Sequence, residues 1–323
     1  MITQVCAICE KNNFEVLYPE NFDIKKINSR IFSARRLPDR IHYRMVKCNN
    51  CSLVYSTPIL EYSKLEKLYK KSYTRYDEHL DNLKETYGYY LKELKKYFPM
   101  SFWRSDVSHD DRILKRSYRS LRSLQDDKRK LLEIGCGNGF FLEEAKHQGY
   151  EVHGVEPGEQ SVKKARLDIR KRIKIDIFRL NLFPKNFFDV ICCFQTFDHV
   201  PDPNSMLKES YRVLKKGGIM LFFNHDIGAL QNKMMGERSP IIDIEHTYLF
   251  DKKTMRKIFE KHKFQVIKVK SAFNIHHLSY WTQLFPIPNV VKLLLIKFFD
   301  KTGLGKIKIK LNPGNLVLIA KKQ

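Results

Sequence analysis

The sequence lacks long apolar runs, and this absence limits where the chain resides. No stretch approaches the ~20 consecutive apolar residues with which a helix spans a bilayer. The N-terminus also lacks the basic, apolar and cleavable parts of a secretory signal. Internal repeats and low-complexity tracts are missing too, so no repeat architecture is predicted. We therefore expect a soluble, cytoplasmic protein.

Acidic residues are scarce relative to basic ones. The 323 residues include 59 Lys and Arg against 36 Asp and Glu, a formal net charge of +23. Such a charge favours anionic partners, for example nucleic acid, acidic lipid headgroups or phosphorylated substrates. The basic residues are spread along the whole chain, so the excess is interpreted mainly as a compositional bias, and guidance of an anionic ligand stays open. The length allows one catalytic domain with appended modules.

Seven cysteines are present, and four of them form two C-x-x-C pairs. The pairs are Cys6 with Cys9 and Cys48 with Cys51, separated by the 38 residues from position 10 to 47. Four thiolates at this spacing predict a tetrahedral zinc site, and because all four positions are cysteine no place remains for a metal-bound water. The site is thus predicted to be structural. Two redox pairs or unligated thiols are the alternative.

A turn rich in glycine follows an apolar strand-like stretch over 130–134. Gly135, Gly137 and Gly139 alternate with other residues, which lets the backbone turn sharply and approach a ligand closely. The helix that begins there would direct free N–H groups at the same ligand. A dinucleotide fingerprint would place its third glycine at position 140, where this chain has Phe140. The pattern therefore argues against NAD or FAD.

An acidic residue, Glu133, lies just before the first glycine and favours a positively charged cofactor over a pyrophosphate. With this residue the segment resembles the first motif of the class I S-adenosylmethionine-dependent methyltransferases. Downstream segments resemble that family in the same order. The resemblance implies a set of cofactor-binding residues: Glu133, Gly135, Cys136 and Gly137 in the first motif, Glu156 for the ribose hydroxyls, Asp176 for the adenine, and Gln195 and Thr196 near the methionine end.

The alternation of strands and helices over 130–224 predicts an α/β fold with a parallel sheet covered on both faces. The resemblance implies a Rossmann-like methyltransferase sheet that closes with an antiparallel strand over 315–320. A helix capped by Asp251 is predicted over 251–260, and a strand over 264–269. We expect a zinc ribbon over 1–58, a helical cap over 59–128, and a methyltransferase domain over 129–323 with an insertion over 271–313. Tyrosines of the cap are expected either to line a substrate pocket or to pack between helices: Tyr73, Tyr76, Tyr87, Tyr89 and Tyr90.

Methyl transfer needs a base near the cofactor when the acceptor still carries its proton. Glu245-His246 resembles a catalytic pair of sugar C-methyltransferases that also have an N-terminal four-cysteine module, although Asp243 replaces their tyrosine. His246 is predicted as the base, with Glu245 orienting it, and His225 is the second candidate. A structural histidine at the entry of a helix is the alternative for His246. His199 is expected to support the cofactor loop, and His276-His277 is a remote third candidate.

The insertion contains an apolar segment with lysines over 280–299. A helix packed on the domain or a dimer contact is the favoured interpretation of this segment, because apolar stripes are more often buried core. Contact with a membrane surface, at the inner face, or closure over a lipid-linked substrate is the alternative. We predict methyl transfer to a small or lipid-linked acceptor, such as a sugar or glycoconjugate precursor. RNA methylation and a non-enzymatic zinc and nucleic-acid-binding protein are the alternatives. RNA methylation is weakened because Phe194-Gln195-Thr196-Phe197 follows the fourth strand of the methyltransferase pattern, where an Asn-Pro-Pro-Tyr-like catalytic motif would be expected. The oligomeric state is not predicted.

Overall fold

The computed structural model describes residues 1–23, 31–32, 40–71, 80–98, 128–284 and 287–323. Two of the cap tyrosines, Tyr73 and Tyr76, and positions 99–127 of the predicted helical cap lie outside these ranges. The helices run over Tyr62–Lys70 (α1), Leu80–Glu93 (α2), Phe140–His147 (α4), Glu159–Lys163 (α5), Leu167–Arg170 (α6), Pro203–Val213 (α7), Leu230–Met235 (α8), Lys252–Lys261 (α9), Leu278–Leu284 (α10) and Asn289–Thr302 (α11).

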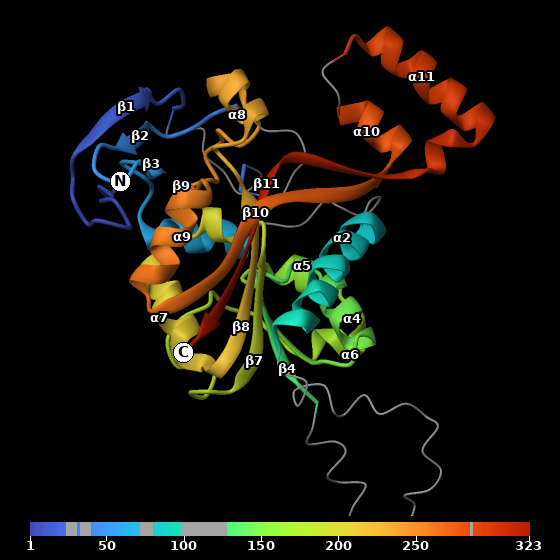
Figure 1. Cartoon of the computed structure of the whole chain (residues 1–323). Coiled ribbons are helices and arrows are strands. Elements are labelled where there is room, and N and C mark those ends of the chain that lie inside the picture. The colour runs from blue at the N-terminus through green and yellow to red at the C-terminus, as the bar shows by residue number, and fades with distance from the viewer. Residues whose placement is uncertain (24–30, 33–39, 72–79, 99–127, 285–286) are drawn as a thin grey trace, which may run out of the picture.

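A seven-stranded sheet forms the centre of the molecule (Figure 1), with the strand order β10-β11-β8-β7-β4-β5-β6. The strands from β4 to β8 pair in parallel, and β11 pairs antiparallel with both β8 and β10. The predicted parallel sheet with an antiparallel closing strand is therefore confirmed. The strands run over Lys130–Ile134 (β4), Glu151–Val155 (β5), Ile173–Lys174 (β6), Phe188–Phe194 (β7), Leu214–His225 (β8), Phe264–His277 (β10) and Lys308–Lys322 (β11).

Helices cover both faces of this sheet. One face carries α2, α4, α5 and α6, and the other carries α7 and α9 (Figure 1). Neighbouring residues of β4 alternate between the two hydrophobic cores, because Leu131 packs with the first group of helices and Leu132 with the second. The predicted helix over 251–260 is observed as α9, with a capping box between Asp251 and Thr254.

Helix α2, part of the predicted cap, lies directly on the sheet. The Tyr87 ring stacks on Phe194 with the ring centroids 4.1 Å apart, and Tyr90 packs against Phe223. Both tyrosines are buried, whereas Tyr89 is half-buried. Two roles were predicted for these tyrosines, lining a substrate pocket or packing between elements. Tyr87 and Tyr90 pack against the sheet and extend the hydrophobic core of that face.

The N-terminal region forms a second, four-stranded sheet with the order β1-β2-β3-β9. Its strands run over Phe14–Tyr18 (β1), Met45–Cys48 (β2), Val54–Ser56 (β3) and Tyr248–Leu249 (β9). The last strand comes from the C-terminal half of the chain, so the predicted 1–58 unit shares its sheet with a distant segment. Tyr55 of β3 stacks on its partner Tyr248 of β9.

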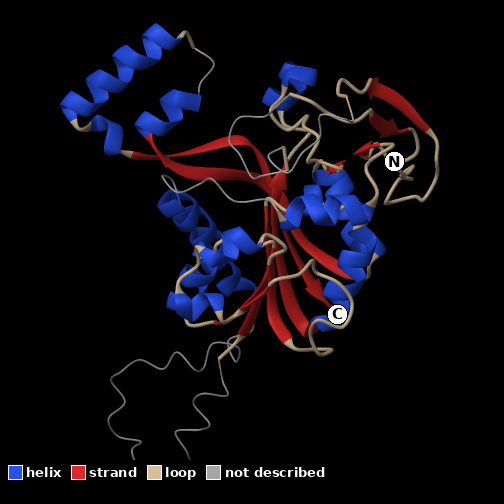
Figure 2. Ribbon diagram, turned by 180° about the vertical axis from the view of Figure 1, so that it is seen from behind, coloured by secondary structure: helices blue, strands red, loops and turns tan. Residues whose placement is uncertain are grey.

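Strands β10 and β11 are longer than the predicted strands and run into the predicted insertion. They stay paired from Asn274↔Leu311 to His277↔Lys308, and the helices α10 and α11 stand at their far end, away from the sheet (Figures 1 and 2). We name residues 273–311 the arm. Trp281 is buried and its indole N–H donates to the Ile309 carbonyl (3.0 Å), which fixes α10 to β11. None of the described helices is both long and apolar enough to cross a bilayer.

Candidate active site

The glycine turn lies between the end of β4 and the start of α4. Gly135, Gly137 and Gly139 have φ angles of +73°, +53° and +74°, which side-chain-bearing residues rarely adopt. A Cβ atom on Gly135 would lie 2.3 Å from Oγ1 of Thr196, so the turn also approaches the segment after β7 too closely for any side chain. The sequence prediction placed both residues in one cofactor site, and the structure brings them together.

Two buried carboxylates accompany this turn. Glu133 is only 2% exposed, and among the described residues its Oε2 has no hydrogen-bond partner. Glu156 accepts hydrogen bonds from the N–H groups of Gly137 (2.9 Å) and Gly158 (2.8 Å). Burial raises the pKa of both carboxyls, and the charge of Glu156 raises that of Glu133 further.

This pair of acids fits S-adenosylmethionine. A buried carboxylate without a partner favours a cationic ligand, because a positive charge offsets the cost of burying the negative one. Glu156 already accepts two hydrogen bonds at the turn, so its oxygens are placed to accept from two hydroxyls as well. Glu133 thus suits the charged methionine end, and Glu156 suits the ribose.

The other predicted cofactor residues lie in different surroundings. Gln195 follows β7 with a φ of +50°, a strained conformation that often marks functional sites, and the Thr196 hydroxyl donates to the Phe194 carbonyl (3.0 Å). The Cys136 side chain is buried beside Gly154, within the hydrophobic core. Asp176, after β6, pairs with Arg179 (2.7 Å).

A cluster of one aspartate and three histidines lies at the carboxyl ends of β7 and β8, where open α/β sheets bind ligands. We call it the Asp198 cluster. The Nε2 atom of His199 lies 3.8 Å from Oδ1 of Asp198, and the Nε2 atoms of His225 and His246 lie 4.0 Å and 3.9 Å from Oδ2. The ring centroids of His199 and His225 lie 4.6 Å and 5.1 Å from that of His246. Three separate segments therefore converge on one carboxylate.

The electrostatics of the cluster keep the aspartate charged and the histidines neutral. Burial lowers the pKa of His225 and of His246 to about 4, and it also lowers the pKa of His199. Burial alone would raise the pKa of Asp198, but the positive charge that the three histidines carry when they are protonated lowers this pKa below its usual value. At neutral pH the cluster thus presents neutral imidazoles that can accept a proton.

Sequence reasoning named the histidines separately and missed Asp198 as their common centre. Glu245 was predicted to orient His246, but the carboxylate beside His246 Nε2 is that of Asp198, while the Glu245 carbonyl accepts from the Tyr69 hydroxyl (3.5 Å). The signal that could have found Asp198 was its position just after the strand that forms β7, next to His199. The pair His276-His277 lies in the arm, where His276 packs against Tyr280 and Trp281.

The N-terminal sheet holds the His246 segment in place. The Ser56 hydroxyl donates to the His246 carbonyl (3.0 Å), and the Ser56 N–H donates to the Thr247 carbonyl (2.9 Å). Thr247 in turn donates its N–H to the Asp198 carbonyl (2.9 Å). The backbone of His246 is therefore fixed between β3 on one side and the Asp198 loop on the other.

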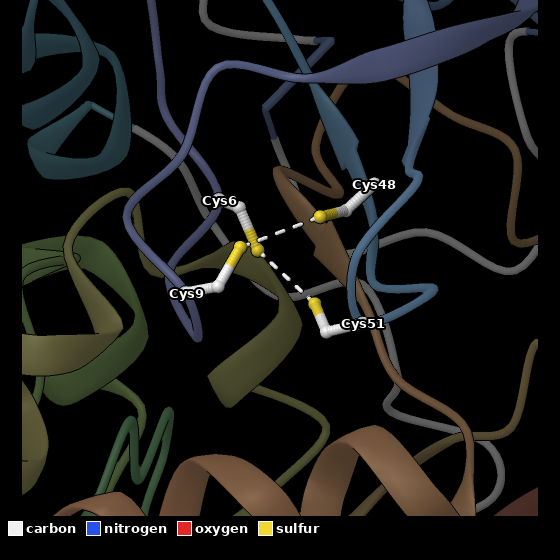
Figure 3. A group of neighbouring side chains, drawn as sticks. All are labelled: Cys6, Cys9, Cys48 and Cys51. Carbon is white, nitrogen blue, oxygen red and sulfur yellow. Dashed lines mark hydrogen bonds between the residues drawn. The ribbon is translucent and has the colours of Figure 1, made fainter.

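The four predicted metal-ligating cysteines point toward one another (Figure 3). The Sγ atoms of Cys6 and Cys51 lie 3.3 Å apart, those of Cys9 and Cys48 lie 3.5 Å apart, and all four lie within 4.8 Å of one another. Sulfurs bound to one tetrahedral zinc at ~2.3 Å are about 3.8 Å apart, so the cluster has the dimensions of a zinc site.

The sheet order, the glycine turn and the acids at the strand ends together define a class I S-adenosylmethionine-dependent methyltransferase. The model of the family described as "Methyltransferase domain" matches residues 107–269, half of the chain, and the chain belongs to this family. The fold, the enzyme class and the cofactor predicted from the sequence are thereby confirmed.

Curated relatives are similar over part of their length. The chain is 34% identical to the ubiquinone biosynthesis O-methyltransferase of Idiomarina loihiensis over 100 residues, 29% of this chain and 41% of that protein. It is 28% identical to the enzyme of the same name from Shewanella sp. over 116 residues, 33% of this chain and 49% of that protein. The chain therefore spans less than half the length of these two relatives.

Solved structures are similar as well. The match to the YcgJ protein of Bacillus subtilis covers 61% of this chain and 92% of that protein, with a TM-score of 0.43 and 18% sequence identity. The match to a SAM-dependent methyltransferase from Archaeoglobus fulgidus covers 72% of this chain and 99% of that protein, with a TM-score of 0.41 and 20% sequence identity.

Proposed function

We propose that the protein methylates a hydroxyl oxygen of a lipid-linked acceptor, such as a glycoconjugate precursor, and that the Asp198 cluster takes up the acceptor's proton. The observation that carries this proposal is the group of neutral imidazoles around Asp198 at the edge of the sheet that holds the cofactor motifs. An oxygen acceptor needs such a base because a hydroxyl is a weak nucleophile until its proton is removed. The O-methyltransferases of ubiquinone biosynthesis, to which the chain is similar, support an oxygen acceptor.

The cofactor, when bound, would supply a methyl group on a sulfonium sulfur, and attack of the acceptor oxygen on that methyl carbon, in line with the C–S bond, would release S-adenosylhomocysteine. The chain's own residues then orient the acceptor and accept its proton. His246 and His225 each direct Nε2 toward Oδ2 of Asp198, so an imidazolium formed on either ring lies next to a negative charge. Asp198 thereby stabilises the protonated histidine without itself taking the proton.

The arm supports a lipid-linked acceptor and contact with a membrane surface. No residue of α11, all of which the structure describes, is buried. Val290, Leu294 and Phe298 share one exposed side of this helix, and Lys297 and Lys301 project from the same side. An exposed apolar face beside lysines is typical of helices that lie in the interface of an acidic membrane. We propose that this face docks on acidic lipid, close to where a lipid-linked acceptor resides.

The four-cysteine cluster is proposed to hold a structural zinc ion. Its four sulfurs would fill a tetrahedral coordination shell, so the ion would act on folding and not on chemistry. Metal analysis of the purified full chain is expected to find one zinc that Cys48→Ser removes. A chain free of zinc with all four thiols reactive would contradict this assignment.

RNA methylation is the second candidate, because the net charge of +23 favours an anionic partner. It predicts RNA binding at low salt that weakens steeply as salt is added. A non-enzymatic nucleic-acid-binding role predicts the same binding without turnover. The absence of RNA binding at low salt would remove both.

The proposed function is tested with methyl-labelled S-adenosylmethionine and two acceptors, a total lipid extract and total RNA. We expect label in an organic-soluble product that resists mild alkali, as an ether does, and none with His246→Ala. Label in RNA alone, or lipid labelling that the variant retains in full, would overturn the proposal.

A further inference from the structure

The Asp198 cluster contains a set of atoms that is typical of metal sites. One ligand atom each from Asp198, His225 and His246 lies within 4.8 Å of the other two. The three residues come from the loop after β7, the end of β8 and the segment before β9. Two imidazoles and one carboxylate form the donor set with which proteins hold divalent transition metals while leaving coordination positions open.

The Asp198 carboxylate needs a positive partner. Its side chain is 1% exposed, and Oδ1 accepts a hydrogen bond from Nδ2 of Asn224 (3.1 Å). Among the residues that the structure describes, no group donates a hydrogen bond to Oδ2. A buried carboxylate oxygen without a donor is costly unless a proton donor or a cation reaches it.

The hydrogen bonds of His225 determine which of its nitrogens faces Asp198 as a lone pair. Asn315 accepts from Nε2 of Gln195 at its Oδ1 (3.3 Å) and donates from its Nδ2 to Asn274 (3.1 Å). Its Oδ1 therefore faces Nδ1 of His225 (3.2 Å), so Nδ1 carries the hydrogen. The Nε2 lone pair of His225 is then directed at the Oδ2 lone pairs of Asp198. Such an outer partner on the second ring nitrogen is the usual accompaniment of a metal-bound histidine.

The separations between each histidine and Asp198 fit one ion after a small adjustment. The separations of 4.0 Å and 3.9 Å between the Nε2 atoms and Oδ2 exceed a hydrogen bond. Two ligand atoms at ~2.1 Å from a tetrahedral ion are about 3.4 Å apart, roughly half an ångström less. The His225 side chain is 26% exposed, so solvent reaches the cluster at this residue.

We propose that Asp198, His225 and His246 bind a divalent transition-metal cation that contacts the acceptor oxygen. The inference rests on the proposed function, because the cation would lower the pKa of the acceptor hydroxyl at the site where the methyl group is received. With the Nε2 atoms of His225 and His246 on the cation, these two rings could not take the proton, and His199, the remaining histidine of the Asp198 cluster, would accept it. Imidazole ligands suit Zn²⁺, Cu²⁺, Fe²⁺ or Ni²⁺, and the carboxylate also suits Mn²⁺.

Mn²⁺ is the suitable probe, because this hard cation prefers nitrogen and oxygen to the four thiolates of the cysteine cluster. The full chain, with zinc in that cluster, is titrated with Mn²⁺ and the free ion is followed by electron paramagnetic resonance. We expect one bound Mn²⁺ per chain. Asp198→Asn and His225→Leu should each weaken binding at least ~100-fold, beyond the range that changes around a metal site usually cost. His262→Gln, which alters a buried histidine outside the cluster, should leave the affinity unchanged.

Calorimetric binding of S-adenosylhomocysteine verifies that each variant is folded. The absence of bound Mn²⁺ in the wild type, or equal affinity in wild type and a folded Asp198→Asn variant, would overturn the cation site. Methyl transfer that persists in that case would leave the proposed function intact. Bound Mn²⁺ without any transfer to lipid or RNA would support the cation site while the proposed function fails.

Discussion

The segment around His246 and the arm use similar apolar residues in opposite ways. Between Ile241 and Phe250 every aliphatic and aromatic side chain is buried, and β3 pairs with β9 within this segment. In α11, Val290, Leu294 and Phe298 are exposed, and no residue of that fully described helix is buried. The first segment fixes a reactive histidine against Asp198, whereas the second leaves an apolar face available to a partner. The same composition thus serves positioning in one place and contact in the other.

The largest effect is expected from breaking the fixed segment at His246 itself. His246→Ala removes a neutral imidazole from the Asp198 cluster and should lower kcat by about 10²–10⁴-fold. Affinity for S-adenosylhomocysteine should stay within about twofold of wild type, because the cofactor residues are elsewhere. Steady-state kinetics with calorimetry checks both. Full turnover by the variant would remove His246 from the mechanism.

The second-largest effect is expected at the glycine turn, where a substitution should weaken binding of S-adenosylhomocysteine. Gly135→Ala would bring a Cβ to 2.3 Å from Oγ1 of Thr196 at a φ of +73°, so we expect at least a ~100-fold loss in S-adenosylhomocysteine affinity, about 2.7 kcal/mol. Gly149→Ala is the matched control, since Gly149 has a φ of +94° and an added Cβ would meet no atom within 4 Å. If Gly149→Ala lost as much affinity as Gly135→Ala in calorimetry, backbone strain, and not the contact with Thr196, would explain the loss.

The exposed apolar face of α11 is tested by introducing negative charges into the arm. Leu294→Asp with Phe298→Asp removes two apolar side chains, each contributing roughly 1.5–3 kcal/mol when fully buried, and adds charge that acidic lipid repels. We expect about a 100-fold loss of binding to acidic vesicles in a flotation assay, without a change in melting temperature. Leu167→Asp, at a residue of α6 that is 70% exposed, is the control and should float like wild type. A wild type that does not float would reject the membrane contact.

A smaller effect is expected from removing the hydrogen bond by which Ser56 of β3 holds the backbone of His246. Ser56→Ala removes the hydroxyl that donates to the His246 carbonyl, and a buried hydrogen bond contributes about 1 kcal/mol. We expect kcat to fall about fivefold with KM unchanged, because His246 is displaced but present. Ser239→Ala removes a similarly buried hydroxyl that donates to Asn232 (2.9 Å) and should leave kcat unaltered. Equal effects on kcat would mean that only stability is affected.

The smallest effect concerns stability against pH. Burial, with the nearby charges of Lys261 and Lys208, lowers the pKa of His262 to about 4 from its ordinary 6.5. The unfolded chain therefore binds more protons between these values, so this residue's contribution to stability is complete above pH 6.5 and is lost as the pH falls toward 4. His262→Gln should lose less melting temperature than wild type between pH 7 and pH 5. Identical losses would contradict the assignment.

The sequence was sufficient for the main sheet and the cofactor turn because local patterns encode both. Alternating strands and helices over 130–224 predict parallel pairing, and Glu133 with Gly135 marks the first motif within a few residues. The cap of α9 by Asp251 was likewise predicted, since a cap depends on neighbours in the chain, whereas its reciprocal capping box with Thr254 was not.

The rest depends on contacts between distant segments. Nothing local to Tyr248 indicates that it pairs with Tyr55 almost two hundred positions earlier, so the joint sheet was missed. Asp198 became the centre of the cluster only when His225 and His246 were brought to it by separate strands. The arm was expected as an insertion, but its extension of β10 and β11 follows from pairing across a long gap, which no local pattern shows.

The most direct test compares how an acceptor is presented. Methyl transfer to a lipid-linked acceptor is measured in acidic vesicles and in detergent, with wild type, the double arm variant and His246→Ala. We predict that the arm variant loses activity only on vesicles, whereas His246→Ala loses it in both. Equal activity of wild type and the arm variant on vesicles, or full activity of His246→Ala in detergent, would contradict this prediction.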